Sequence, residues 1–379
     1  MGKIKVLNIV TSNIGYNGIC TSLLNYYRNI DSHIVRMDFL APNKVDKKLR
    51  NDFESAGGNK LLEATVNEQK MYKVKPISYY FMLKKLIKNE KYDIVQVHGS
   101  SSMMLVHLLA AKRAGVKVRI AHCRNTKSDH KLLHKILLPA FRKTYNVAFA
   151  CGREAGEWLF GKNADFMVVP NGKDVDVFKY NDVVRKEYRE KYNLDDKIVI
   201  GHIGNFNYQK NHDYLINIFN ELASRNDKYR LVLVGKGDLQ NEIKQKVKKL
   251  GLDDKVLFLG QVPVDEVAKL LNMMDIMVFP SRFEGFPNVL IEWQMNGLPC
   301  VISDAITKDV RITDLVRFMS LEKDAKDWAD EIENVCIMDR NVSQDVILEQ
   351  IRETGYDIKS NAKMLEKRYG ELVRREDLK

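Results

Sequence analysis

Short apolar runs rich in β-branched residues alternate along this chain with longer segments whose apolar residues recur at helical spacing. In the first half the pattern predicts strands at 4–10, 34–39, 94–98, 118–122, 147–150 and 167–169, with helices between most of them. A second series of strands is predicted at 197–204, 230–235, 255–260, 275–280 and 298–303. This alternation is typical of parallel sheets covered by helices. The sequence therefore predicts two doubly wound α/β units.

The break between the two series lies in residues 168–178, where a Pro-Asn-Gly triplet at 170–172 has the chemistry of a turn. A chain of 379 residues also exceeds what one hydrophobic core usually serves. We therefore expect more than one domain. The expected parts are an N-terminal domain at 1–175, a C-terminal domain at 176–355, and a last segment at 356–379 that contains one amphipathic helix, roughly 356–372.

Composition narrows the class of protein. Hydrophobic residues make up 45% and charged residues 29% of the chain, ordinary values for a soluble globular protein. The five cysteines form no C-x-x-C pair, which favours a reducing cytoplasm and argues against a zinc site. The apolar stretch at the N-terminus is too brief for a signal peptide. The longest apolar-rich segment, 103–114, contains charged residues and is shorter than a membrane-spanning helix.

The net charge of +11 is unevenly distributed, with +14 in residues 1–178 and −3 in residues 179–379. A domain of one sign attracts anionic partners. Nucleic acid, anionic lipid and phosphorylated substrates are all candidates on charge alone.

The residues that follow the strands carry the chemistry, because open parallel sheets bind ligands at the carboxyl ends of their strands. After the strand at 275–280, Glu284 and Glu292 stand with seven residues between them, and a helix should begin near Pro287 or Asn288. Unpaired N–H groups at a helix start suit a diphosphate, and Gly285 would allow a close approach to the backbone. Two carboxylates are thus predicted beside an anion site.

This segment resembles the signature of the retaining GT-B glycosyltransferases of glycosyltransferase family 4, which have two such glutamates before an A/W-x-x-x-G-x-P segment. Residues 296–299, Asn-Gly-Leu-Pro, complete the match. The resemblance covers essentially the whole chain. It implies an α/β protein of two facing Rossmann-like domains, with the C-terminal helix returning to the first. It also implies that Glu284 contacts the donor sugar and Glu292 a ribose hydroxyl.

Lys210 follows the strand at 197–204 and is similar to the family lysine that neutralises the donor diphosphate. The chain departs from the family pattern at Asn205, where arginine is usual, and at Asn211, where glycine is usual. One of two cations on the leaving group is therefore missing, and Arg282 is a candidate to replace it.

Two more segments resemble donor-site segments of the family. Gly235 and Gly237 permit a tight turn beside the nucleotide, and Val262 lies in the segment whose backbone reads the base. The full set expected to bind the nucleotide sugar is Gly18, Gly204, Asn205, Lys210, Gly235, Val262, Glu284, Gly285, Phe286, Asn288, Val289 and Glu292.

The first domain supplies the acceptor side. Gly18 resembles the second glycine of the family's Gly-Gly loop, and Asn17 replaces the first. His98 and His122 end two predicted strands that should be neighbours. The resemblance implies three catalytic residues, Lys210, Glu284 and His122. Of these, His122 is expected to hydrogen-bond the transferring sugar. Asn17 and His98 are expected on the acceptor side.

Residues 124–145 predict a basic amphipathic helix, kinked near Pro139. Lys127, Lys131, Lys135 and Arg142 fall on one stripe, and Leu133, Ile136, Leu137 and Ala140 fall on the opposite face. Two interpretations stay open. The helix either packs its apolar face on the sheet with its charges in water, or docks on a membrane surface.

Taken together, the residues predict a retaining glycosyltransferase that acts on a nucleotide sugar, with UDP-sugar the expected donor. A saccharide or a polyprenyl-diphosphate-linked acceptor in cell-surface polysaccharide synthesis is implied by resemblance to capsule and exopolysaccharide enzymes. We expect no cofactor and no metal, because Lys210 and a helix terminus would neutralise the leaving group. We also expect a cytoplasmic protein, which would be peripheral on the inner face of the membrane under the second interpretation of the 124–145 helix.

Three other functions compete with this prediction. A dinucleotide-dependent oxidoreductase needs G-x-G-x-x-G after a strand with an acidic residue about 20 residues on, which neither half supplies. A nucleic-acid-binding protein is disfavoured because no nucleic-acid-binding motif accompanies the basic half. A catalytically weak sugar-binding or scaffolding protein of the same fold stays open because of Asn205.

Overall fold

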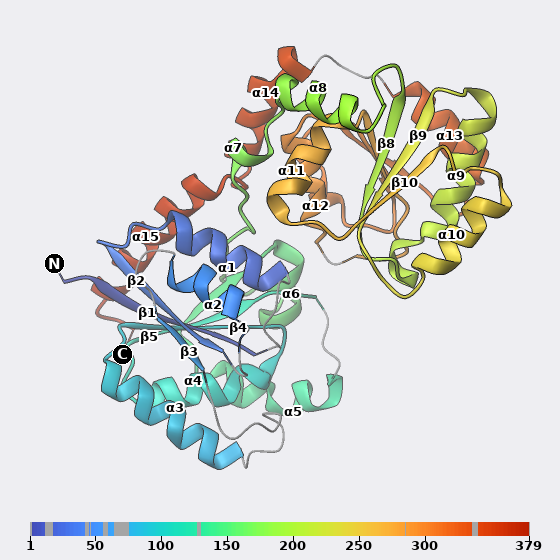
Figure 1. Ribbon diagram of the computed structural model, residues 1–379. Helices are drawn as coiled ribbons and strands as arrows, with labels where there is room; N and C mark the ends of the chain where they lie inside the picture. Colours follow the sequence, from blue (N-terminus) through green and yellow to red (C-terminus); the bar gives the residue numbers. More distant parts are fainter. Residues whose placement is uncertain are drawn as a thin grey trace. The chain divides into compact units, whose positions relative to one another are not determined.

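The computed structural model describes residues 2–11, 18–41, 45, 47–55, 60–63, 76–126, 130–284, 286–335 and 340–378. The chain forms two compact units. Unit 1 comprises Met1–Gly172 and Asp357–Lys379, and unit 2 comprises Lys173–Tyr356. Each unit is built on its own parallel sheet (Figure 1).

Within the described residues, the sheet of unit 1 has the strand order β3-β2-β1-β4-β5-β6-β7. The sheet is parallel throughout, and His98 pairs with His122 across β4 and β5. Every strand predicted in this half is present, and the short strand β3 was not predicted. The strands are β1 (Ile4–Val10), β2 (Val35–Ala41), β3 (Leu61–Glu63), β4 (Ile94–Gly99), β5 (Val118–Cys123), β6 (Val147–Ala150) and β7 (Met167–Val168).

Helices cover both faces of this sheet, and Figure 1 shows α3 and α4 on one side with α1 and α15 on the other. The last helix, α15, packs its buried residues into the same core as α1. Its Tyr369 hydroxyl donates to Gln96 Oε1 at 2.7 Å, inside the sheet. The helices are α1 (Gly18–Asn29), α2 (Lys47–Glu54), α3 (Pro76–Glu90), α4 (Leu105–Arg113), α5 (Lys131–Arg142), α6 (Arg153–Phe160) and α15 (Ile358–Arg374).

The sheet of unit 2, in the part of the chain described, has the order β10-β9-β8-β11-β12-β13 and is also parallel. All five strands predicted here are present, and β13 was not predicted. They are β8 (Ile198–Ile203), β9 (Tyr229–Val234), β10 (Val256–Gly260), β11 (Ile276–Phe279), β12 (Cys300–Ser303) and β13 (Val316–Met319). The helices are α7 (Val175–Phe178), α8 (Asp182–Lys191), α9 (His212–Arg225), α10 (Gln240–Lys249), α11 (Val264–Met273), α12 (Val289–Met295), α13 (Ala325–Asn334) and α14 (Arg340–Glu353).

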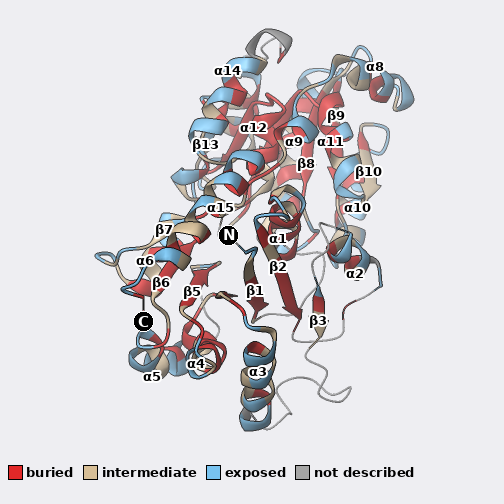
Figure 2. Ribbon diagram, turned by 90° about the vertical axis from the view of Figure 1, so that its left-hand side faces the viewer, coloured by how far each residue is buried: buried red, intermediate tan, exposed pale blue. Residues whose placement is uncertain are grey.

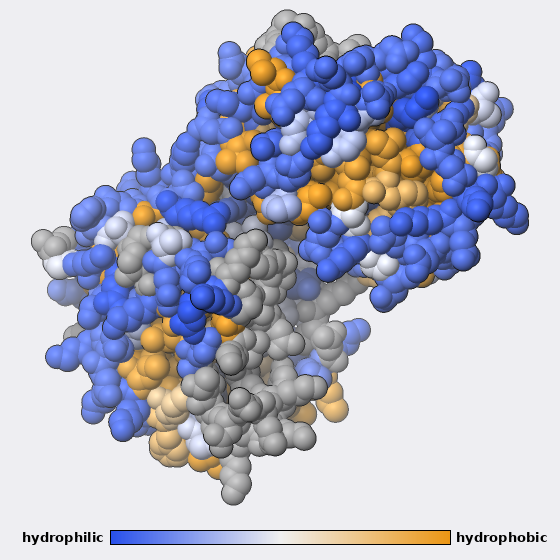
Figure 3. Space-filling view, viewed as in Figure 1, coloured by the Kyte–Doolittle hydropathy of each residue, from blue (hydrophilic) through white to orange (hydrophobic). Residues whose placement is uncertain are grey.

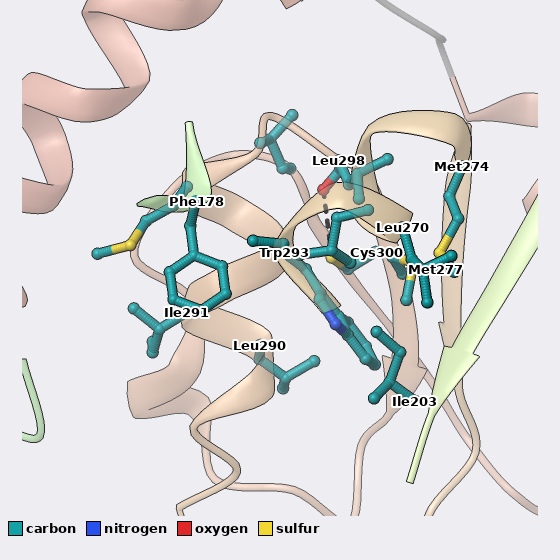
Figure 4. Packing of buried hydrophobic residues seen from close by; sticks show 14 of the residues in the cluster. Phe178, Ile203, Leu270, Met274, Met277, Leu290, Ile291, Trp293, Leu298 and Cys300 are labelled. Atoms are coloured by element: carbon teal, nitrogen blue, oxygen red, sulfur yellow. Dashed lines mark hydrogen bonds between the residues drawn. The ribbon is translucent and has the colours of Figure 1, made fainter. Parts of the chain in front are cut away.

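The core of unit 2 fixes helix α12, which carries the second predicted glutamate. Trp293 is fully buried and meets Phe279 of β11 edge to face at 5.3 Å. Leu290 and Ile291 pack in the same cluster (Figure 4). Buried aromatic and aliphatic side chains supply most of the free energy that holds such an element in place. Most strands of both units are correspondingly buried (Figure 2), whereas β7 and β10 are largely half-buried or exposed.

Candidate functional site

The first part of the candidate site is a set of backbone contacts at the carboxyl edge of the unit 2 sheet. Gly204 N–H donates to Val234 O at 2.9 Å, and Gly235 N–H donates to Gly260 O at 2.8 Å. A Cβ at Gly235 would lie 2.0 Å from Gly204 O, and the residue has φ +141°. Only glycine fits this position. The predicted G-x-G turn therefore packs directly on the loop that leads to Lys210.

Lys210 and Glu284, both predicted as catalytic residues, are brought together. Lys210 Nζ lies 2.7 Å from Glu284 Oε1, and the side chains are 15% and 8% exposed. The ammonium group also lies 4.4 Å from the centre of the Phe279 ring. Lys210 ends a short 3-10 helix after β8 and Glu284 follows β11, so two loops at one sheet edge supply the pair.

The structure explains one departure from the family pattern. Asn211 adopts φ 57° and ψ 42°, the left-handed region in which glycine is usual and asparagine is the best tolerated side chain. Its Nδ2 donates to Pro280 O at 3.1 Å. Asparagine therefore preserves the backbone geometry that places Lys210.

The second departure leaves room for another cation. Asn205 is exposed. Arg282 donates from Nη1 to Tyr208 O at 3.0 Å and lies 4.3 Å from the Tyr208 ring, beside the turn that carries Lys210. This geometry supports the prediction that Arg282 replaces the missing arginine. The replacement stays a prediction.

Glu292 has a partner that sequence analysis missed. Lys173 Nζ lies 2.5 Å from Glu292 Oε1, and both side chains are only 9% exposed. Helix α12 begins at Val289, and Glu292 lies in its first turn rather than beyond it. The two partners are 119 residues apart in sequence, so spacing gave no signal of the pair.

Apolar contacts complete this edge of unit 2. Phe286 stacks on Tyr356 with ring centres 5.6 Å apart and planes 8° apart. Val262 and Val289 are half-buried against the unit 2 core, and Asn288 immediately precedes α12. Gly285 lies outside the described residues. Figure 3 shows apolar surface on this unit over the strands near β10.

Two buried histidines beneath Lys210 were also missed. His202 ends β8 and donates from Nδ1 to Val278 O at 2.8 Å, and its ring lies 4.6 Å from that of His212. Burial holds the pKa of His202 well below its usual value and lowers the pKa of His212 to about 4. Both rings are therefore neutral at physiological pH, and they add no positive charge beside the Lys210 ammonium.

The predicted residues of unit 1 form a separate polar cluster. His98 and His122 are each 1% exposed, with ring centres 4.9 Å apart. Gln96 Nε2 lies 2.9 Å from His122 Nδ1, and Arg124 Nη1 lies 3.2 Å from His122 Nε2. Burial, with a smaller effect of the Arg124 charge, holds the pKa of both histidines well below the usual value. Gly18 begins α1, and Asn17 lies outside the described residues.

The chain contains one Asp-x-Asp sequence, at Asp174 and Asp176, which has a structural explanation. The Asp174 side chain accepts from Asp176 N–H at 2.9 Å and caps α7, and Lys179 pairs with Asp176. Within the residues that the structure describes, no group of three or more His, Cys, Asp or Glu side chains is arranged to hold a metal ion. Nor does any described helix have the length and apolar character to cross a membrane.

Comparison with known proteins identifies the family. Residues 17–177 match the model "Glycosyltransferase Family 4", and residues 184–348 match "Glycosyl transferases group 1". EpsF of Bacillus subtilis strain 168 is 30% identical over 370 residues, which cover 94% of each chain. The chain belongs to glycosyltransferase family 4. The expectation of a transferase enzyme from this family is thereby confirmed.

This family 4 glycosyltransferase is also similar to a characterised relative and to two solved structures. The UDP-Gal:alpha-D-GlcNAc-diphosphoundecaprenol alpha-1,3-galactosyltransferase of Escherichia coli is 30% identical over 248 residues, 61% of this chain and 62% of that protein. Anabaena HepE in complex with UDP and glucose has a TM-score of 0.73 at 16% identity, over 97% of this chain and 100% of that one. A glycosyltransferase from Rickettsia africae has a TM-score of 0.76 at 16% identity, with 99% and 100% coverage. The predicted GT-B fold of two Rossmann-like units is confirmed.

Proposed function

We propose that this glycosyltransferase moves a sugar from a UDP-sugar to a saccharide or polyprenyl-diphosphate-linked acceptor, with retention at the anomeric carbon, in cell-surface polysaccharide synthesis. The observation that carries the proposal is the pair of Lys–Glu contacts, Lys210 with Glu284 and Lys173 with Glu292, at the carboxyl edge of unit 2. Charged groups held in a fixed geometry and largely removed from water are what a phosphate-leaving reaction requires.

In the proposed reaction the bond between the anomeric carbon and the β-phosphate oxygen breaks, and the acceptor oxygen bonds to the same face of that carbon. The acceptor proton passes to the leaving phosphate. Lys210 and the backbone N–H groups of 286–289 stabilise the departing diphosphate, as a charge and a helix terminus can. Glu284 contacts the sugar, Glu292 a ribose hydroxyl, Val262 the base, and His122 the transferring sugar. No metal is required in this scheme.

The Lys210–Glu284 contact links the two charged groups of the donor site. The Glu284 carboxylate neutralises the Lys210 ammonium group at 2.7 Å. A bound diphosphate carries more negative charge and competes for Lys210, which frees Glu284 to accept a hydrogen bond from a sugar hydroxyl. Donor binding and the preparation of Glu284 are thus one event.

The choice of donor and acceptor is supported by similar proteins. The Escherichia coli relative is named for UDP-Gal and a diphosphoundecaprenol acceptor, and the HepE structures hold UDP, glucose and UDP-glucose. A further relative is the Salmonella typhi Vi polysaccharide biosynthesis protein VipC/TviE, 31% identical over 156 residues. These names support UDP-sugar and polysaccharide synthesis over other donors and pathways.

The proposal is tested with the whole protein by thermal shift against UDP-, GDP- and ADP-sugars, followed by turnover assays in EDTA. UDP-sugars should raise the melting temperature most, and turnover should survive the chelator. A preference for GDP- or ADP-sugars would overturn the donor assignment. Turnover lost in EDTA and restored by magnesium would overturn the metal-independent mechanism.

The alternative of a catalytically weak sugar-binding protein is motivated by Asn205, and the position of Arg282 beside the Lys210 turn weighs against it. Donor hydrolysis separates the two. A transferase releases UDP from UDP-sugar slowly without acceptor, whereas a binding protein is stabilised by the same UDP-sugar without releasing UDP.

We further propose that unit 1 docks on anionic membrane through α5. Two interpretations of this helix were open, and the structure does not support packing of Leu133, Ile136 and Ala140 on the sheet, because they are exposed, Ile136 by 65%. Periodicity identified the stripe but not the direction in which it points. His134 and Phe141 are the buried side chains of α5, Leu137 is half-buried, and Pro139 lies inside the helix.

Apolar and basic side chains are therefore exposed on the same helix. Leu132 is 74% exposed beside Lys131 and Lys135, and Arg142 is also exposed, while Lys127 lies outside the described residues. The helix begins at Lys131 and not at residue 124. Apolar insertion and an electrostatic attraction of about 1 kcal/mol per basic residue would add at an anionic bilayer.

The membrane proposal is tested by sedimentation with liposomes that contain phosphatidylglycerol. Replacing Lys127, Lys131, Lys135 and Arg142 by glutamine should release the protein from the liposomes and leave UDP affinity unchanged. Replacing the exposed Lys244, Lys248 and Lys249 of α10 in unit 2 is the matched control. Equal sedimentation of the α5 variant and wild type would return α5 to an ordinary solvated helix.

A further inference from the structure

Arg124 is a half-buried cation for which no carboxylate partner is present among the described residues of unit 1. It follows β5 directly, and its Nη2 is buried with no hydrogen-bond partner there. Its Nη1 lies 3.2 Å from His122 Nε2. The titratable groups that most affect it are Cys151, Tyr26, Cys123 and Cys20, and no carboxylate is among them. A buried charge normally has a partner of opposite sign.

Three arginines that are more deeply buried than Arg124 have hydrogen-bond acceptors or an ion pair among the described residues. Arg119 donates to the carbonyl oxygens of Thr144 at 2.8 Å and Val116 at 2.7 Å. Arg189 pairs with Asp275 at 3.1 Å. Arg340 donates to Asn296 Oδ1 at 2.7 Å and to two backbone carbonyls at 3.0 Å. Arg124 is therefore a poor candidate for a structural arginine.

The surroundings of Arg124 offer hydrogen bonds but no negative charge. A cavity of about 10 Å³ is lined by this residue together with Asn8, Gln96, His98 and His122. That volume holds about one water molecule. A water can satisfy Nη2, yet it leaves the charge uncompensated. Both histidines are neutral, because burial depresses their pKa, and they likewise supply no anion.

We propose that Arg124 is an anion-binding residue of unit 1 that takes a phosphate group of the acceptor, the diphosphate of a polyprenyl-linked saccharide. The planar guanidinium group matches phosphate oxygens in a two-point contact. The donor diphosphate already has Lys210 in unit 2, whereas the acceptor diphosphate has no other assigned cation. The assignment rests on the proposed function, and the +14 charge of residues 1–178 draws such an anion toward this unit.

The test uses inorganic pyrophosphate as the probe, at constant ionic strength, with saturating UDP to occupy the donor site. Titration calorimetry should show pyrophosphate binding to the wild-type protein under these conditions. Arg124→Met should weaken that binding at least tenfold, and Arg124→Lys should weaken it less. UDP affinity should stay within twofold in both variants.

A second measurement separates binding from a structural role. Without ligand, Arg124→Met should melt no lower than wild type, since it removes an uncompensated charge. The control Arg119→Met should melt several degrees lower and still bind pyrophosphate, because the Arg119 guanidinium group donates from Nε and Nη1 to three backbone carbonyl oxygens of unit 1.

Three results would overturn the proposal. They are no pyrophosphate binding by wild type in the presence of UDP, equal binding by Arg124→Met, and a loss of UDP affinity that parallels the loss of pyrophosphate. The last result would mean that Arg124 contributes to binding of the UDP-sugar donor and not of the acceptor. Failure of the proposed function is distinguishable, because it would appear as absence of UDP-sugar binding in all variants, while the pyrophosphate titration can still be read without UDP.

Discussion

The two units differ in how charged side chains are arranged at the carboxyl ends of their strands. In unit 2 each buried cation of the candidate donor site has a carboxylate, Lys210 with Glu284 and Lys173 with Glu292. In unit 1 the strand ends carry neutral histidines and Arg124, whose Nη2 has no partner among the described residues. The unit 2 site is electrically balanced before a ligand arrives, and the unit 1 site is not.

This difference separates two ways of binding an anion. A paired lysine must exchange its carboxylate for the ligand, so the exchange can prepare the carboxylate for a second task. An unpaired arginine gives up no protein contact when it binds. The folded protein is instead less stable in the absence of the anion. The paired arrangement suits a site that also carries out the chemistry, and the unpaired one suits a site that only holds substrate.

The largest expected effect comes from breaking the deepest pair. Lys173→Met leaves Glu292 buried without a counter-charge and should lower the free energy of unfolding by about 3–5 kcal/mol. Urea unfolding measures this loss. The double variant Lys173→Met/Glu292→Gln should recover most of it. A loss under about 1 kcal/mol in the single variant would show that the pair is not buried as described.

Removing the other lysine should affect chemistry more than stability. Lys210→Met withdraws a charge from the leaving diphosphate and should lower kcat by about 10²–10³-fold, as the loss of one preorganised electrostatic contact does. Turnover with UDP-sugar measures the effect. Lys246→Met, at an exposed ion pair with Asp213, is the matched control and should leave kcat unchanged. Equal kcat in the two variants would remove Lys210 from the proposed mechanism.

Acid should destabilise unit 1 through its buried neutral imidazoles, and His107 isolates one of them. Burial lowers the pKa of His107 to about 4, and neither ring nitrogen has a partner among the described residues. The unfolded chain takes up a proton below pH 6.5 and the folded chain does not, so stability falls between pH 6.5 and about 4. The slope is about 1.4 kcal/mol per pH unit.

His107→Leu should remove that part of the pH dependence, up to about 3 kcal/mol over the window. Urea midpoints at pH 7 and pH 5 measure it. The control His33→Leu changes an exposed ring and should keep the wild-type slope. An unchanged slope in His107→Leu would mean that this ring is protonated in the folded protein.

The smallest expected effect tests the backbone behind Lys210. Asn211→Ala places an alanine in the left-handed region and should destabilise the protein by about 1–2 kcal/mol. Asn211→Gly should cost less, because glycine adopts this conformation freely. Thermal melts and the KM for UDP-sugar measure both. Equal destabilisation by alanine and glycine would show that the Pro280 hydrogen bond, not the conformation, is what matters at this position.

The sequence predicted the sheets well because buried parallel strands are apolar over their whole length. It missed β3, which has three residues, and β13, whose exposed Arg317 interrupts the apolar run. It did not predict the pairing of Lys173 with Glu292, because an ion pair between residues far apart in the chain leaves no local pattern. It did not identify Arg124 either, because the absence of a partner leaves no pattern in the sequence. The sequence identified the basic and apolar faces of α5 but left their surroundings open, since periodicity defines a face without saying what that face contacts.

One backbone contact has a consequence for how such enzymes diversify. Lys173 N–H donates to Tyr356 O at 2.8 Å, and these are the first and last residues of unit 2. The chain thus enters and leaves unit 2 at neighbouring residues. Unit 2 is therefore a continuous segment, here called a cassette, that is inserted before the final helix of unit 1. Close termini make a segment exchangeable with little disturbance of its host. Recombination at residues 172/173 and 356/357 would replace one cassette by another in a single step and leave its host intact.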